Sequence, residues 1–132
     1  MISSSLNSYA NQYRQMPYSS EELNKQELKT PTQILQRIDL SNTDYQLGMG
    51  IASYKPNAIK TSQYQNGPEV LYVLNGEITY CAKGKNSKII KKGESYKIPA
   101  GEVHYSQAGP NGADILASWI LQKNKPFAIP IS

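Results

Sequence analysis

From Gln33 onward the chain alternates short runs of apolar and β-branched residues with clusters of turn residues. Runs of this length, at regular spacing and without a sustained helical period, predict the strands of an antiparallel sandwich or barrel. The runs that we interpret as strands are 34–40, 45–54, 59–65, 70–74, 77–83, 88–90, 95–98, 103–107 and 114–121. No internal repeat is visible, so the pattern predicts one all-β domain.

Asn75-Gly76 is the clearest turn signal, because it separates two apolar runs. A type I′ turn requires φ > 0 at both central residues, and Asn-Gly meets that requirement best. We therefore expect a two-residue hairpin here, and a loop at 109–112 before the last strand.

Residues 1–31 are polar, rich in Ser, Asn and Gln, and poor in β-branched residues. Ser19 and Glu22 have the spacing of a capping box, which predicts a short helix over about 20–29. We expect this N-terminal arm to be partly disordered or to pack on a partner subunit. The predicted domain organisation is therefore an arm of 1–31 followed by a barrel domain of 32–132.

A chain of 132 residues is one domain by length and is large enough to bury a core without disulfides. Its only cysteine, Cys81, excludes an intrachain disulfide and a Cys-rich zinc site, and we interpret it as a small buried side chain. No apolar run reaches the ~20 residues that span a bilayer, and the N-terminus has no export signal. We expect a soluble protein, cytoplasmic, or periplasmic if an export signal was removed.

The net charge of +4 comes largely from lysines between residues 83 and 97. A nucleic-acid patch would account for them, but no arginine, the preferred residue for bidentate phosphate binding, lies among them. Lysines also keep a solvated hairpin soluble and protect its edges from pairing. We favour the hairpin and expect no nucleic acid and no membrane as partners.

Strand alternation predicts which side chains point into the domain. Gln63, Gln65 and Glu69 share the parity of Leu71 and Val73, provided that the intervening corner preserves it. We therefore expect these three polar side chains to face inward with the apolar ones.

The only histidine, His104, shares its face with Glu102 and Ser106, whereas Tyr105 points the other way. A small polar cluster is thus expected inside an otherwise apolar domain, consisting of Gln63, Gln65, Glu69 and His104. A second inward face, expected to be core, consists of Ile115, Ala117, Trp119 and Leu121.

The spacing across residues 57–104 resembles the two-motif signature of the cupin superfamily. The first motif is carried by Asn57, Gln63, Gln65, Glu69 and Gly76. The second is carried by Gly93, Pro99, Gly101 and His104. Every spacing matches, but the signature has Gly where Asn57 stands and His where Gln63 and Gln65 stand. The resemblance implies one double-stranded β-helix (jelly-roll) barrel over about residues 32–131, similar to the small single-domain bacterial cupins.

In metal-bearing cupins the two first-motif histidines, the glutamate and the second-motif histidine bind one divalent ion. On this resemblance Glu69 and His104 keep two ligand positions, whereas Gln63 and Gln65 put neutral carboxamides at the other two. If each lost imidazole costs at least as much as an outer-sphere change, affinity falls roughly 10²–10⁴-fold. Amide oxygens also suit Mg²⁺, Ca²⁺ or Mn²⁺ better than copper or zinc. We expect no cofactor, or a weakly bound divalent metal ion.

The resemblance and the polar cluster together imply a small-molecule ligand held by Gln63, Gln65, Glu69 and His104. The protein is then a binding module or a metal-independent enzyme in which His104 and Glu69 are the catalytic acid–base pair. The glutamines are explained equally well as a ligand cradle or as remnants of a lost metal site.

Two alternatives stay open from the sequence. One is a metal-dependent cupin enzyme, dioxygenase- or isomerase-like, that uses glutamine ligands. The other is a non-catalytic scaffold or interaction domain, because one barrel hosts unrelated functions. Since cupins are frequently dimers, the resemblance also implies a homodimer.

Overall fold

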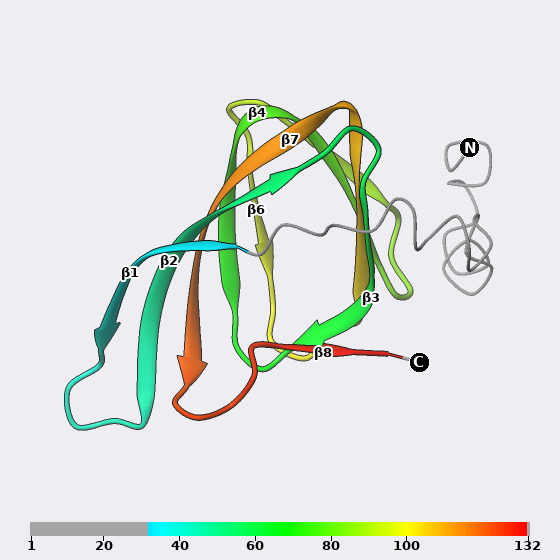
Figure 1. The fold of residues 1–132 in the computed structure, drawn as a ribbon. Coiled ribbons are helices and arrows are strands. Elements are labelled where there is room, and N and C mark those ends of the chain that lie inside the picture. Colours follow the sequence, from blue (N-terminus) through cyan, green and yellow to red (C-terminus); the bar gives the residue numbers. More distant parts are fainter. Residues whose placement is uncertain (1–31, 132) are drawn as a thin grey trace.

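The computed structural model describes residues 32–131, and every regular element in this range is a strand (Figure 1). In chain order the strands are β1 (Gln33–Asp39), β2 (Tyr45–Tyr54), β3 (Ile59–Gln65), β4 (Glu69–Ala82), β5 (Lys88–Lys91), β6 (Ser95–Ile98), β7 (His104–Gln122) and β8 (Ala128–Pro130). None of these residues forms a helix that could cross a membrane. The predicted all-β class is confirmed, and the predicted arm with its helix over 20–29 lies outside the described residues.

Two long strands, β4 and β7, take part in both layers of the domain. The first half of β4 pairs antiparallel with the second half of β7, so that Glu69 lies opposite Trp119. The second half of β4 pairs with the first half of β7, so that Ala82 lies opposite His104. Each strand therefore leaves one layer and enters the other, and the two strands pair with each other in both layers.

The remaining strands extend these two layers. One layer has the order β1-β2-β7-β4-β6, and the other has the order β8-β3-β7-β4-β5. The layers face one another as in a jelly roll, which confirms the predicted fold (Figure 1). Among residues 32–131 the sheet does not close completely, because β1 pairs only with β2 and β8 only with β3.

The predicted hairpin at Asn75-Gly76 is wrong, since both residues lie inside β4. Gly76 does have a φ of 73°, as the turn prediction requires. The pairing of β4 with β7 shifts register between Val73 and Asn75 and again between Gly76 and Ile78. Such bulges bend a strand and increase its twist. The left-handed residue therefore redirects β4 into the second layer instead of reversing the chain.

A matching bend occurs in β7, where the sequence predicts a loop at 109–112. Gly112 has a φ of 76° and lies within the continuous strand. A Cβ atom on Gly76 would lie 2.0 Å from the carbonyl oxygen of Gly112, so the two bends touch through their backbones. Asn57, which replaces a signature glycine, also has a left-handed φ of 60°, a conformation that Asn tolerates.

Apolar side chains fill the space between the layers around these bends. Val73, Ile78 and Ile90 are each 0% exposed, and burying an aliphatic side chain of this size contributes about 1.5–3 kcal/mol. Cys81 is also fully buried, as predicted. The packed core therefore fills the part of the interior around the bends.

The lysines between residues 83 and 97 are all exposed, as expected for a solvated hairpin. They lie on β5, on β6 and in the connections that follow β4 and β5. Lys85 pairs with Glu102 at 2.7 Å, an exposed contact of the kind that contributes little stability.

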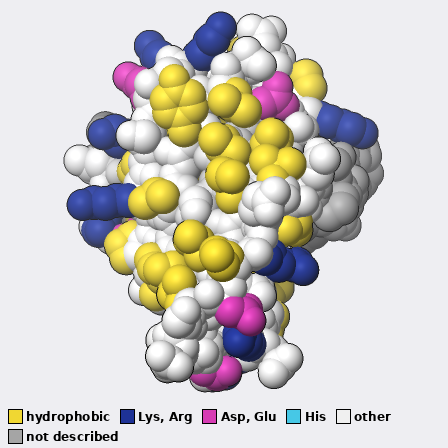
Figure 2. Space-filling view, turned by 90° about the vertical axis from the view of Figure 1, so that its left-hand side faces the viewer, with side chains coloured by type: hydrophobic (Ala, Val, Ile, Leu, Met, Phe, Trp, Pro, Cys, Tyr) yellow, Lys and Arg dark blue, Asp and Glu magenta, His cyan; other side chains and the backbone are white. Residues whose placement is uncertain are grey.

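Apolar side chains gather on the outer side of the molecule that carries β1 and β2 (Figure 2). Ile38 is 63% exposed and is the register partner of Leu47, which is 38% exposed. Val70, on β4 of the same layer, is 58% exposed. Patches of this kind are common at interaction surfaces; the predicted homodimer stays a prediction.

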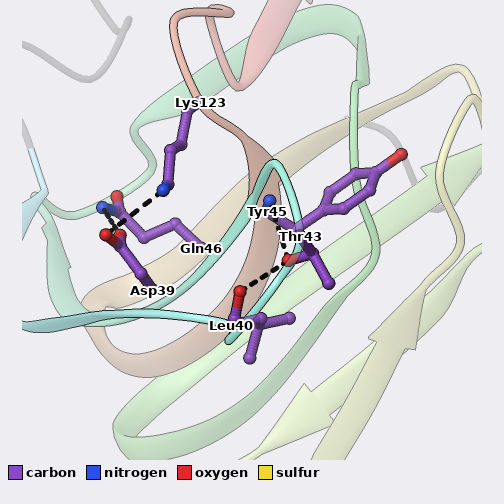
Figure 3. A network of polar contacts seen from close by, with 6 residues as sticks. All are labelled: Asp39, Leu40, Thr43, Tyr45, Gln46 and Lys123. Carbon is purple, nitrogen blue, oxygen red and sulfur yellow. Dashed lines mark hydrogen bonds and ion pairs between the residues drawn. The ribbon is translucent and has the colours of Figure 1, made fainter.

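Strand β1 is an edge strand whose seven residues are all exposed, and a polar network fixes its far end (Figure 3). Thr43 Oγ1 donates to the Leu40 carbonyl at 2.8 Å and accepts from the backbone N–H of Tyr45 at 3.1 Å. Gln46 Nε2 donates to Asp39 Oδ1 at 3.0 Å, and Lys123 Nζ lies 3.2 Å from Asp39 Oδ2. The network ties β1 to the turn that follows it and to the end of β7.

The contact between the two bends can be tested with a matched pair of glycine substitutions. Gly76→Ala and Gly84→Ala both place a side chain at a left-handed φ (73° and 78°), but a Cβ at Gly84 meets nothing within 4 Å. We expect Gly84→Ala to lower the free energy of unfolding by about 1–2 kcal/mol. Gly76→Ala should lower it by about 2–5 kcal/mol, because overpacking adds to the conformational cost. Urea denaturation measures both, and equal losses would contradict a close approach of the bends.

Candidate functional site

A cavity of about 330 Å³ lies between the two layers, a size typical of small-molecule sites. All four polar residues predicted from the sequence line it, namely Gln63, Gln65, Glu69 and His104. They come from β3, the first residue of β4 and the first residue of β7. The structure therefore brings together the cluster that strand alternation predicts.

Strand pairing and the corner between β3 and β4 produce this convergence. Gln63 is the register partner of His104, and Gln65 Nε2 donates a hydrogen bond to Glu69 Oε1 at 2.6 Å. A Cβ atom on Gly67 would lie 1.7 Å from the carbonyl oxygen of Ile120, so the corner passes directly against the backbone of β7. Only glycine fits there, and this tight corner is what keeps Gln65 and Glu69 on the same face.

His104 is held in one tautomer by the backbone. Its Nδ1 lies 2.9 Å from the Glu102 carbonyl oxygen, and a carbonyl can only accept, so Nδ1 carries the proton. The side chain is 4% exposed, and burial lowers the pKa of the imidazole, opposed by the bond to Glu102. At neutral pH the ring is therefore uncharged, and Nε2 is left with a lone pair for a proton or a hydrogen-bond donor.

The pKa of the Glu69 carboxyl is shifted in the direction that favours the neutral acid. Burial raises the pKa of its carboxyl, while the hydrogen bond from Gln65 and the charge of Lys60 lower it to a smaller extent. Desolvation disfavours the charged carboxylate, which is the physical cause of the net upward shift. A neutral imidazole and a carboxyl with a raised pKa thus line the same cavity.

Two buried amide atoms of the site have no hydrogen-bond partner among residues 32–131. They are Nε2 of Gln63, a donor, and Oε1 of Gln65, an acceptor. Leaving a buried polar atom unsatisfied costs about 1–3 kcal/mol, so native proteins rarely retain such atoms without a reason. A molecule in the cavity that offers one acceptor and one donor would satisfy both.

The donor set does not fit the four-ligand metal centre of metal-bearing cupins. Within residues 32–131 no group of three or more His, Cys, Asp or Glu side chains is placed to hold a metal ion. The Gln65 amide also directs its N–H group, not a lone pair, toward the Glu69 carboxylate. One imidazole and one carboxylate remain, and a weakly bound divalent ion stays a prediction.

The sequence does not reveal two cationic residues of the cavity, Lys60 and Arg37. Lys60 and Gln63 have opposite parity, yet both line the cavity, because β3 shifts register between them. In the same way β1 shifts register between Ile34 and Gln36, and both Ile34 and Arg37 line the cavity. A bulge reverses the alternation on which the prediction depends.

Trp119 forms a flat wall of the cavity that the sequence predicts only as core. A Cβ atom on Gly48 would lie 2.5 Å from Trp119 Cε2, and one on Gly50 would lie 3.1 Å from its outer edge. The two glycines therefore form a slot on β2 over which the indole lies. The Phe127 ring is 5.7 Å from the indole and inclined by 47°. Of the predicted core face, Ile115 and Ala117 are buried, whereas Trp119 and Leu121 are only half-buried.

The sequence matches a family model described as a cupin domain over residues 50–113. The matched region runs from the end of β2 to the bend in β7 and contains all four predicted site residues. A search of curated proteins finds no match.

Several solved structures share the fold. A cupin-like protein from Thermotoga maritima MSB8 is 23% identical, with a TM-score of 0.56, over 76% of this chain and 74% of that one. A cupin 2 conserved barrel domain protein from Leptotrichia buccalis is 29% identical, with a TM-score of 0.55, over 70% of this chain and 40% of that one.

An oxalate oxidase in complex with the substrate analogue glycolate is 19% identical, with a TM-score of 0.56, over 64% of this chain and 46% of that one. The chain thus spans less than half the length of that enzyme, and at this identity the likeness shows the fold alone. The family match, the jelly-roll layers and the cupin-like neighbours agree, and they identify residues 50–113 of the chain as a cupin domain.

Proposed function

We propose that the protein binds a small molecule in the cavity between its layers, without requiring a metal ion. The observation that carries the proposal is the pair of buried amide atoms, Gln63 Nε2 and Gln65 Oε1, that have no partner in the described part of the chain. A folded protein that retains two such atoms beside a cavity gives up about 2–6 kcal/mol of stability. A bound ligand that satisfies both atoms recovers that free energy as affinity.

The polar groups define what the ligand must offer. Gln63 Nε2 donates a hydrogen bond, whereas Gln65 Oε1 and His104 Nε2 accept one. The surrounding wall is largely apolar and aromatic, with Tyr80, Trp119 and Phe127 among its members. A small molecule with an apolar body, an acceptor and a donor fits this arrangement.

The same geometry supports proton transfer. His104 has a lowered pKa and an Nε2 lone pair, and Glu69 has a raised pKa, so the imidazole can act as the proton acceptor and the carboxyl as the proton donor. A metal-independent acid–base reaction is therefore compatible with the site, and so is binding alone. The metal-dependent alternative is less well supported. In its hydrogen bond to Glu69, the Gln65 amide presents an N–H group, whereas a metal ligand would have to present a lone pair.

The cost of the unsatisfied donor can be measured by removing it. Gln63→Met keeps the length of the side chain but deletes the amide, so we expect the ligand-free protein to become more stable by about 1–3 kcal/mol. Urea denaturation measures the change, and Gln36→Met on exposed β1 serves as the control that should change little. In a thermal-shift screen of small polar molecules, compounds that stabilise the wild type should lose their effect on Gln63→Met. A destabilised Gln63→Met would show that the amide is already satisfied within the fold.

Elemental analysis of protein purified without a chelator tests the metal-independent part of the proposal. We expect less than one equivalent of any transition metal, and Gln63→His combined with Gln65→His should raise zinc or manganese affinity by at least about 100-fold. A full equivalent of metal in the wild type would favour the metal-dependent alternative instead.

The charge state of Glu69 gives a pH-dependent prediction. Its folded-state pKa is raised above the ordinary 4.5, so the wild type loses stability as the pH rises from that value through the folded-state pKa. Glu69→Gln should therefore be more stable than the wild type at pH 7, and the gain should disappear near pH 4. Denaturation at both pH values measures the difference. The buried His104 contributes a loss on acidification to both proteins alike, because its pKa is lowered from 6.5. A gain that grows on acidification would contradict the raised pKa.

A further inference from the structure

The charged side chains that line the cavity do not balance. Among the lining residues that the structure describes, Arg37 and Lys60 are cationic and Glu69 is the one residue of opposite charge. His104 adds no positive charge at neutral pH. The cavity wall therefore carries a net positive charge even when Glu69 is ionised, and a larger one when the carboxyl is protonated.

Lys60 lies close to the polar cluster. Burial has the largest influence on the pKa of both Glu69 and His104, but Lys60 lowers both values, which places its ammonium group within electrostatic reach of both. On β3 it is the register partner of Ser106, whose buried hydroxyl also lines the cavity.

No ion pair within residues 32–131 involves Lys60, whose half-buried side chain lines the cavity. Moving a cation out of bulk water costs free energy unless an anion lies close to it. Because the amide donor of Gln63 lies on the same strand, β3 offers two hydrogen-bond donors, one of them charged, to one bound group. A carboxylate, with two acceptor oxygens, matches such a pair of donors.

The cluster also places a second, opposite requirement on the ligand. Gln65 Oε1 and His104 Nε2 are both acceptors, so they call for a donor on the ligand, such as a hydroxyl or N–H group. In the wall of the same cavity, the indole of Trp119 lies over Gly48 and Gly50, and the Phe127 ring is inclined to it. A flat apolar body packs well on such a wall.

From these features we infer that the ligand is a small organic acid with one carboxylate on a flat apolar body that also carries a hydroxyl or N–H donor. Lys60 and Gln63 bind the carboxylate, Gln65 and His104 accept from the donor, and the ring lies on Trp119. The inference rests on the proposed function and specifies its ligand class. Lys60 is the residue on which specificity for the anion depends.

Calorimetric titration with matched acids and amides tests the inference. The probes are 3-hydroxybenzoate and indole-3-acetate, each compared with its uncharged carboxamide, on the wild-type protein. We expect at least one acid to bind more tightly than its amide, with an affinity that falls as salt is added. If neither acid binds more tightly than its amide, the inference is overturned.

Substitution of Lys60 then tests whether the carboxylate of the ligand binds at this residue. Lys60→Met should weaken binding of the acid by about 30-fold or more, because one partner of a partly buried charge pair is lost. Binding of the amide should stay within a few-fold, which also shows that the variant is folded, and Lys60→Arg should restore most of the acid affinity. Lys97→Met, an exposed lysine outside the cavity lining, is the matched control.

The two proposals fail in different ways. If acids and amides bind equally and Lys60→Met affects neither, the cavity binds small molecules but the charge selectivity is wrong. If no probe or screened compound binds and Gln63→Met is no more stable than the wild type, the proposed function itself is wrong.

Discussion

The bends of β4 and β7 at Gly76 and Gly112 are the constraint on which the domain depends. Both strands change layer there, and neither position has room for a Cβ atom, because Gly76 lies against the carbonyl oxygen of Gly112 and Gly112 against that of Tyr54. Glu69 begins β4 seven residues before one bend, and His104 begins β7 eight residues before the other. Because strands rise at a nearly constant rate per residue, the two side chains lie at similar depth in facing layers. The site is thus a geometric consequence of how the long strands fold over.

Because of this arrangement, the interior of the domain is apolar around the bends and contains buried polar side chains at the site. Around the bends, aliphatic side chains such as Val73 and Ile78 are fully buried and stabilise the fold by about 1.5–3 kcal/mol each. On a different strand, β3, Gln63 and Gln65 are buried with amide atoms left without a partner in the described part of the chain, at about 1–3 kcal/mol each. The stabilisation from the apolar residues is large enough to offset the cost of the unsatisfied amide atoms. The fold can therefore tolerate a site that is unfavourable when no ligand is bound. A scaffold selected for stability alone would have apolar residues at these positions.

Much of the site is predictable from the sequence, because the motif spacing fixes Gln63, Gln65, Glu69 and His104 on particular strands. Alternation then orients them correctly, since the corner at Gly67 preserves parity. The same rule fails wherever a strand contains a bulge. The sequence pattern does not predict Lys60 as a cavity residue, and it predicts a hairpin where β4 bends at Gly76. Both features depend on which strand pairs with which and in what register. Register is set by contacts between residues far apart in the chain, and a local pattern does not contain that information.

The part of the cavity formed by β1 depends on a different kind of contact from the rest. All seven β1 residues are exposed, so this strand gains little from burial and is held by pairing with β2 and by the network at Asp39 (Figure 3). The hydrogen bond from Gln46 and the charge of Lys123 lower the pKa of Asp39, so its carboxylate keeps both contacts at neutral pH. Arg37 lies two residues before Asp39 on the same strand. The position of this cavity cation is therefore set by polar contacts at the surface, whereas Lys60 is positioned by strand pairing in the second layer. Lys60 shares β3 with Gln63 and lies within electrostatic reach of Glu69 and His104, which is why the anion is assigned to it.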